Sequence, residues 1–167
     1  MNVELLEKVK AHILEEPKRI RMEAWVFSEH FTEDDKAFAR SFLMEEIYSK
    51  EHNVDRLLAA LQPFSNLLDF PACGTVACIA GWGKILEQTD PESALRNPVF
   101  LSDLACLSEF ENAARFGLEM RQALRLFYVR HWPVAYSLKY ARAKTSDARA
   151  HITANRIDHF IATNGEE

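Results

Sequence analysis

Residues Pro71–Gly83 read PACGTVACIAGWG and hold two of the three cysteines, three of the five glycines and one of the three tryptophans. The Thr75 hydroxyl can accept a hydrogen bond from a free amide at the start of a helix. Cys78 and Trp82 follow four residues apart and therefore share one helical face. The stretch predicts a central helix over about 75–88 against which the other helices pack.

The two glycines inside this predicted helix need an explanation. Gly81 and Gly83 each destabilise a helix by about 1 kcal/mol relative to alanine. Close approach of another helix backbone, with a tryptophan filling the space beside it, would offset that loss. The sequence thus predicts a structural packing hub made of Thr75, Cys78, Gly81, Trp82 and Gly83.

Apolar residues recur at helical spacing through most of the remaining chain. Asn2 is the predicted N-cap of a first helix, which Pro17 ends. We expect an all-α fold of about seven helices and no convincing strand, with Phe110 and Ala114 facing inward and Gly117 ending a helix. Further helix starts are predicted at Thr32, Asn53, Ser102 or Asp103, near Met120, at Pro133, and at Thr145 or Ser146.

Length and composition place the chain among ordinary globular proteins. With 167 residues, 48% of them hydrophobic, and a net charge of −5, it fits one all-α domain over 1–167. Three cysteines do not suit a disulfide framework and favour a reducing cytoplasm. The sequence predicts no signal peptide, and no apolar run reaches the roughly 20 residues that span a membrane.

The motif C-G-T-x-x-C-I-A-G-W at Cys73–Trp82 resembles that of a family of uncharacterised bacterial and phage-associated helical proteins. The similarity continues in the segment from Gly117 to Phe127, in Trp132-Pro133, and at both ends of the chain. Residues 28–70 depart from it and look like an insertion. The resemblance implies a helical fold and brings no known activity.

Cys73 is the candidate for thiol chemistry. It precedes the predicted central helix, where free amides and the helix dipole can lower the pKa of a thiol. The spacing from Cys73 to Cys78 is C-x4-C, however, whereas dithiol oxidoreductases use C-x-x-C. On the apolar face near Trp82, Cys78 would pack as a small hydrophobe. Packing is the favoured role, with Cys73 kept as a catalytic candidate.

A metal site would need several ligands brought together by the fold. Cys73 and Cys78 could form one ligand pair, completed by His131 or Cys106. Polar residues also gather near one face of the last predicted helix, at offsets 0, 4, 7 and 8, which could hold a metal or form an acid–base pair: His151, Asn155, Asp158 and His159. These spacings match no known metal template, and a solvated polar face explains them equally well.

The C-terminal third is basic. Residues 119–167 carry 8 Lys and Arg against 5 Asp and Glu, a net charge of +3, which leaves −8 for residues 1–118. Aromatic residues lie between these cations, so the segment could bind nucleic acid. Alternatively, the cations are solvated and the aromatics are turned into the core. The candidate binding surface consists of Arg121, Arg125, Arg130, Lys139 and Arg142.

No nucleotide-binding, hydrolase, metalloprotease or calcium-binding signature occurs in the sequence. It therefore predicts no cofactor and leaves catalysis uncertain. We expect a non-catalytic cytoplasmic protein that acts through contacts with a protein partner or by self-association, away from membranes. A nucleic-acid accessory role through residues 121–156, and a thiol- or metal-dependent site at Cys73, are the alternatives.

Overall fold

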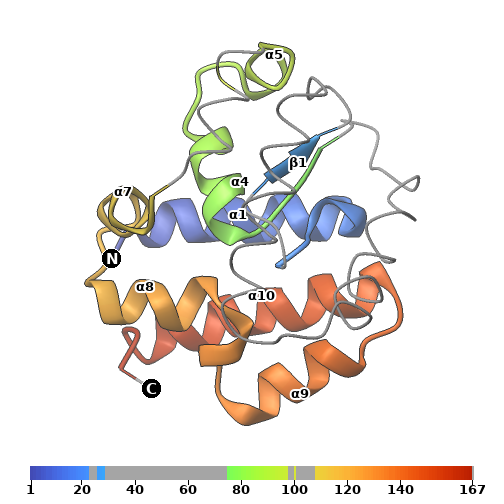
Figure 1. Cartoon of the computed structure of the whole chain (residues 1–167), viewed down its shortest axis with the longest axis vertical. Coiled ribbons are helices and arrows are strands. Elements are labelled where there is room, and N and C mark those ends of the chain that lie inside the picture. The colour runs from blue at the N-terminus through green and yellow to red at the C-terminus, as the bar shows by residue number, and fades with distance from the viewer. Residues whose placement is uncertain (23–25, 29–74, 98–99, 101–107, 167) are drawn as a thin grey trace, which may run out of the picture.

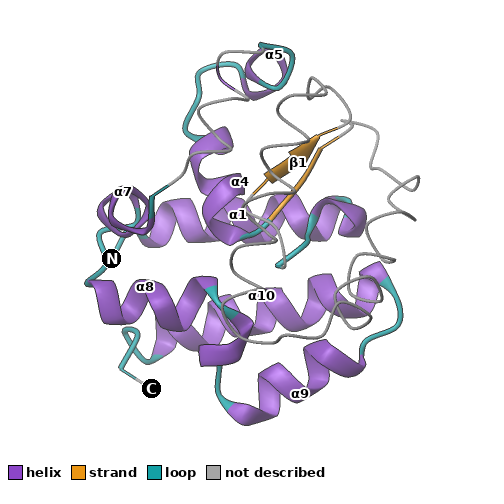
Figure 2. Cartoon of the chain, viewed as in Figure 1, coloured by secondary structure: helices purple, strands orange, loops and turns teal. Residues whose placement is uncertain are grey.

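In the computed structural model, residues 1–22, 26–28, 75–97, 100 and 108–166 are described. They contain seven α-helices, which confirms the predicted all-α class (Figures 1 and 2). Their bounds are α1 Val3–Glu15, α4 Ile79–Leu86, α5 Pro91–Ala94, α7 Glu109–Arg115, α8 Met120–Phe127, α9 Val134–Arg142 and α10 Ser146–Ala162. Two 3-10 turns, η1 Pro17–Arg19 and η2 Val129–His131, join neighbouring elements. The possible insertion at 28–70 lies, apart from Ser28, outside the described residues.

Helix α1 packs along α10 and also contacts α4 (Figure 1). Its start is as predicted, because the Asn2 side chain accepts from the amide of Leu5 at 3.1 Å. The predicted apolar face is buried and forms part of the main core: Leu5, Leu6, Val9 and Ile13. Both chain ends lie on the same side of the molecule in Figure 1. The backbone amide of Asn2 donates to Phe116 at 2.7 Å, which ties the N-terminus to α7.

Residues 75–78 differ from the prediction. Thr75 does not cap a helix; it begins strand β2, Thr75–Ala77, which pairs antiparallel with β1, Val26–Ser28. Helix α4 starts only at Ile79, and its N-cap is Cys78, whose side chain makes no capping hydrogen bond. Pairing with a distant strand satisfies the backbone of this segment, so the expectation of no strand was wrong here.

Helix α4 is nevertheless central. Six of its eight residues are buried, and it contacts α1, α5, α7, α8 and β2. The sequence predicts that another helix backbone lies close to the glycines. At Gly83 the close neighbour is instead a side chain, since a Cβ added there would overlap the ring of Phe116. Trp82 is fully buried and its indole Nε1 donates to the Arg19 carbonyl at 2.8 Å. Trp82 and Gly83 thus hold α4 against η1 and α7.

Helix α7 begins at Glu109. Its N-cap is Ser108, whose hydroxyl accepts from Glu111 at 3.2 Å. The predicted starts at Ser102 and Asp103 lie outside the described residues, as do those at Thr32 and Asn53. Phe110 is 76% exposed and Ala114 is exposed as well, so neither faces inward as predicted. Gly117 ends the helix as predicted, with φ +58°.

Helices α9 and α10 form a pair at the C-terminal end of the chain (Figure 1). Pro133 is the N-cap of α9, and Thr145 caps α10 by accepting from Ala148 at 3.2 Å. Trp132, just before α9, is buried, and its indole Nε1 donates to the Leu126 carbonyl at 2.9 Å. The connection between the two helices is short, so they lie as adjacent neighbours.

Candidate functional site between helices α9 and α10

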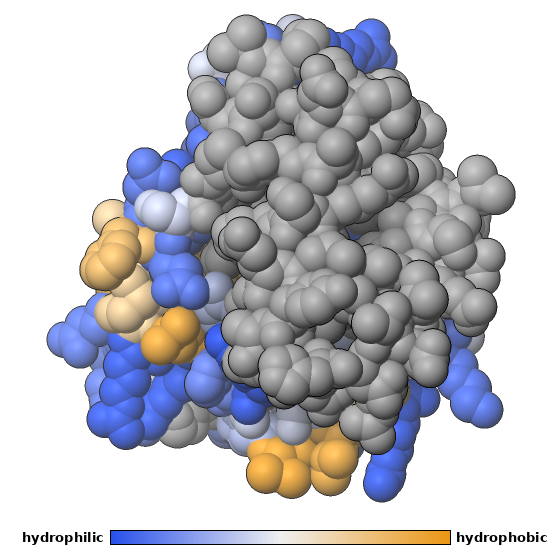
Figure 3. Space-filling model, in the orientation of Figure 1, coloured by the Kyte–Doolittle hydropathy of each residue, from blue (hydrophilic) through white to orange (hydrophobic). Residues whose placement is uncertain are grey.

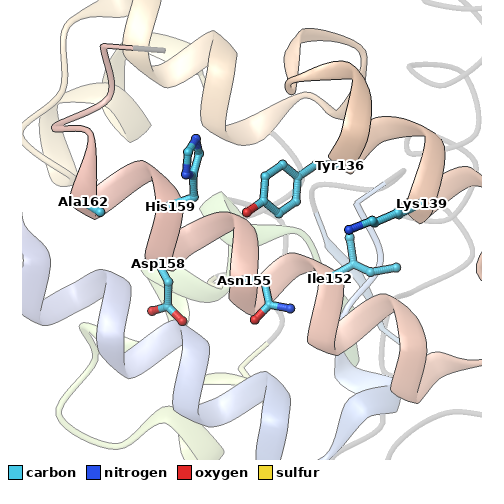
Figure 4. A pocket seen from close by; sticks show the side chains of 7 residues that line it. All are labelled: Tyr136, Lys139, Ile152, Asn155, Asp158, His159 and Ala162. Atoms are coloured by element: carbon cyan, nitrogen blue, oxygen red, sulfur yellow. The ribbon is translucent and has the colours of Figure 1, made fainter.

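An open pocket of about 390 Å³ lies between α9 and α10. Its volume falls within the range of roughly 300–1,000 Å³ that is usual for small-molecule sites. Two of its lining residues come from α9 and five from α10 (Figure 4): Tyr136, Lys139, Ile152, Asn155, Asp158, His159 and Ala162.

Helical spacing brings the polar members of this pocket together. Asn155, Asp158 and His159 stand at offsets of three and four on α10, so they share one face. Tyr136 and Lys139, three residues apart on α9, reach across toward that face (Figure 4). The polar α10 face expected from the sequence therefore lines a pocket, except that His151 is exposed and does not line it.

Aromatic contacts position the wall of the pocket. The rings of Tyr136 and His159 have centroids 5.6 Å apart and are tilted by 32°. Behind Tyr136 lies the buried Arg156, whose guanidinium carbon is 5.9 Å from the Tyr136 centroid and 5.3 Å from that of Phe160. The Arg156 guanidinium also donates to the Arg125 carbonyl at 3.0 Å. These contacts hold the Tyr136 ring from α8 and α10.

The one acidic pocket residue is bound to a lysine. Lys10 on α1 contacts Asp158 at 2.6 Å and Glu7 at 2.5 Å. The hydrogen bond to Asp158, followed by the one to Glu7, raises the pKa of Lys10 above its usual value. In Figure 4 the Asp158 carboxylate points away from Tyr136. The pair thus joins α1 to α10 beside the pocket.

The outer face of α9 carries apolar side chains that the core does not use. Val134 is 71% exposed and Leu138, one turn later, is 47% exposed. In Figure 3 an apolar patch lies at the edge of the molecule formed by α9. Ala135 and two cations are exposed beside them. We call this surface the α9 outer face and define it as Val134, Ala135, Leu138, Lys139 and Arg142.

The five predicted basic residues are divided between different environments. Arg121, Arg130, Lys139 and Arg142 are exposed, whereas Arg125 is half-buried and donates to the Gly165 carbonyl at 3.2 Å. Arg125 thus fastens the C-terminal turn to α8. Only Lys139 among the five lines the pocket.

The aromatic residues of the same segment are mostly engaged within the fold. Trp132 and Tyr140 are buried, and the Tyr140 hydroxyl accepts from the amide of Met22 at 3.1 Å. The Tyr128 hydroxyl donates to Glu109, and the Arg130 guanidinium carbon lies 5.0 Å from the Tyr128 ring centroid. Unlike Tyr128, Trp132 and Tyr140, Tyr136 lines the pocket between α9 and α10.

Of the sulfur and metal candidates with described positions, Cys78, His131 and His151 do not line this pocket, whereas His159 does. Cys73 and Cys106 lie outside the described residues, and Cys78 is buried as a free thiol. Burial raises the pKa of Cys78 to about 11, so its thiolate form is disfavoured. Among the residues with described positions, no three His, Cys, Asp or Glu side chains are grouped to hold a metal ion. His131 is exposed and accepts from Arg130 at 3.2 Å.

Sequence reasoning missed the α9 side of the pocket. The sequence predicts Lys139 on a basic surface and leaves Tyr136, one of the interleaved aromatics, either on that surface or in the core, yet both line the same hollow as the polar α10 face. Their spacing of three residues was the available signal, because it places them on one side of a helix. That this side faces Asn155 and His159 follows from the packing of α9 on α10.

In the part of the chain that the structure describes, no helix combines the length and apolar character needed to cross a bilayer. No family model, curated protein or solved structure matches this chain. The family resemblance of the Cys73–Trp82 motif therefore stays a prediction.

Proposed function

We propose that this protein is a non-catalytic, cytoplasmic interaction protein that docks an acidic amphipathic segment of a partner protein on the α9 outer face. The observation that carries the proposal is the exposure of Val134 and Leu138 one turn apart on a helix that the core already holds from its other side. Large exposed apolar side chains spaced one turn apart on one face of a helix are a feature of helix-docking surfaces.

Charge indicates the kind of partner. Helix α9, Val134–Arg142, contains two cations and no acidic residue. Lys139 and Arg142 are exposed beside the apolar pair. A second copy of α9 lying on this face would bring like charges together, which is unfavourable. A partner helix with an apolar stripe and acidic flanks would match both features.

The engagement of Trp132, Tyr140 and Tyr128 within the fold supports a protein partner over nucleic acid, since single-stranded binding uses exposed aromatic rings for base stacking. The free, buried thiol of Cys78 supports a reducing compartment such as the cytoplasm.

A photo-crosslinking residue placed at Leu138 in the full chain, expressed in its host cells, tests this proposal. We expect one discrete protein adduct that is absent when the same residue replaces Glu92, an exposed position on α5. Adding Val134→Asp to the Leu138 photo-crosslinking variant should abolish the adduct, because a carboxylate would meet the acidic partner.

Three outcomes would overturn the proposal. Equal adducts from positions 138 and 92 would show that α9 is not a specific surface. An adduct of twice the chain mass would assign the face to self-association. An adduct that nuclease treatment removes would assign it to nucleic acid.

A further inference from the structure

The pocket behind α9 contains a cation available to a ligand. Lys139 is exposed and lines the pocket, and it forms no ion pair with a described residue. In Figure 4 its ammonium group is directed from α9 toward α10. An ammonium group in this position offers up to three hydrogen-bond donors to one ligand group.

The negative charge of the pocket is already engaged. Asp158 is held by Lys10 at 2.6 Å, on the side of α10 that faces α1. The Arg156 guanidinium near Tyr136 is buried, so the exposed charge that faces this part of the pocket is that of Lys139. An anion would be attracted to this part of the pocket, whereas a cation would be repelled.

Flat and polar walls complete the hollow. The Tyr136 and His159 rings, 5.6 Å apart, form one wall, and the aliphatic side chain of Ile152 lines another part. The Asn155 amide offers both a donor and an acceptor. A planar ring lying against Tyr136 or Ile152 would place an anionic substituent within reach of Lys139.

We infer that the α9–α10 pocket binds a small organic anion, namely a flat ring that bears a carboxylate or a phosphate group. The Lys139 ammonium pairs with the anionic oxygens, Tyr136 and Ile152 contact the ring, and Asn155 fixes its orientation. Lys139 also belongs to the α9 outer face, but Tyr136, Ile152 and Asn155 do not, so anion binding can be measured in the absence of the proposed partner. A charge-assisted hydrogen bond supplies most of the selectivity.

Benzoate, phenyl phosphate and benzamide are suitable probes, followed by two-dimensional NMR titration of the purified full chain. Benzamide has the shape of benzoate without its charge. We expect benzoate or phenyl phosphate to shift the signals of Tyr136, Asn155 and His159 and to bind about tenfold more tightly than benzamide. The tighter of the two anions identifies the ligand class as a carboxylate or a phosphate ester.

Lys139→Met keeps the stem of an exposed side chain and removes its charge. We expect it to weaken binding of the preferred anion about tenfold, and Lys144→Met, a matched change at an exposed lysine outside the pocket, to alter it less than twofold. Circular dichroism checks that both variants are folded.

The proposal is overturned if no probe binds, or if benzamide binds as tightly as both anions. It is also overturned if Lys139→Met and Lys144→Met have equal effects. Tenfold anion selectivity that depends on Lys139 alone would establish the site.

Discussion

Gly83 of α4 lies directly against the ring of Phe116, so closely that a single added carbon at Gly83 would overlap the ring. Phe116 is fully buried and also packs on Phe127, with ring centroids 5.4 Å apart. The ring cannot move outward without disturbing that second contact. The packing of α7 on α4 therefore requires a glycine at this position, even though glycine makes the helix less stable than alanine would.

Gly83→Ala should lower the free energy of unfolding by up to about 2 kcal/mol, because an overpacking loss of roughly 1–3 kcal/mol outweighs the gain of about 1 kcal/mol in helix propensity. Urea denaturation measures the change. The double variant Gly83→Ala/Phe116→Leu should be more stable than the sum of the two single changes predicts, since the smaller side chain makes room. Strict additivity would contradict the overlap.

His12 predicts a pH dependence of stability. Its ring lies 4.3 Å from that of Trp82, and burial, together with the nearby Arg19 guanidinium, lowers the pKa of His12 to about 4 from 6.5. The unfolded chain thus binds a proton at this histidine near pH 6.5, whereas the folded chain binds it only near pH 4. The contribution of His12 to the free energy of unfolding is therefore fully present above pH 6.5 and is lost as the pH decreases toward 4.

The expected loss from His12 over that window is roughly 1–2 kcal/mol once solvent screening is allowed for. His12→Phe keeps an aromatic ring against Trp82 and cannot titrate. Urea denaturation at pH 7.5 and pH 4.5 should therefore show a smaller acid loss for His12→Phe than for the unchanged chain. Carboxylates titrate in both proteins, so an equal loss in the two would mean that His12 is not responsible.

Tyr140 links α9 to the segment that follows η1. Its buried hydroxyl accepts from the amide of Met22 at 3.1 Å. Tyr140→Phe leaves that amide without this acceptor and should lower the free energy of unfolding by about 1–3 kcal/mol. Tyr136→Phe is the matched control, because Tyr136 is half-buried in the open pocket, and we expect a change within about 0.5 kcal/mol. Thermal and urea denaturation compare the two variants, and equal losses would contradict the role of the Met22 contact.

Elements with strong local signals were predictable from the sequence. Asn2 and Thr145 accept the capping hydrogen bonds expected of them, and Gly117 adopts the left-handed conformation expected at a helix end. Each of these depends on residues within one turn of the chain. The apolar face of α1 was predictable for the same reason, since its period is local.

Features set by distant residues could not be predicted in this way. Thr75 is a good helix cap by residue type, yet its backbone pairs with Ser28 in a strand that is far away in sequence. Phe110 has the right spacing for a core position, but the face of α7 that is covered depends on its packing against α4 and α8, and Phe110 is left exposed. The pocket was half predictable, because the α10 face was visible in the sequence and its α9 partners were not.

The last prediction concerns the reactivity of Cys78, which lies in the stretch that suggested thiol chemistry. Its thiol is buried at the start of α4, and burial raises its pKa to about 11. In a variant whose two other cysteines are replaced by serine, native Cys78 should react with a disulfide reagent at least about a thousandfold more slowly than in the urea-unfolded chain, because both access and thiolate formation require opening. Gly83→Ala, which destabilises α4, should accelerate the reaction. Rapid labelling of the native variant would show that the Cys78 sulfur is accessible and would reopen a catalytic role for this segment.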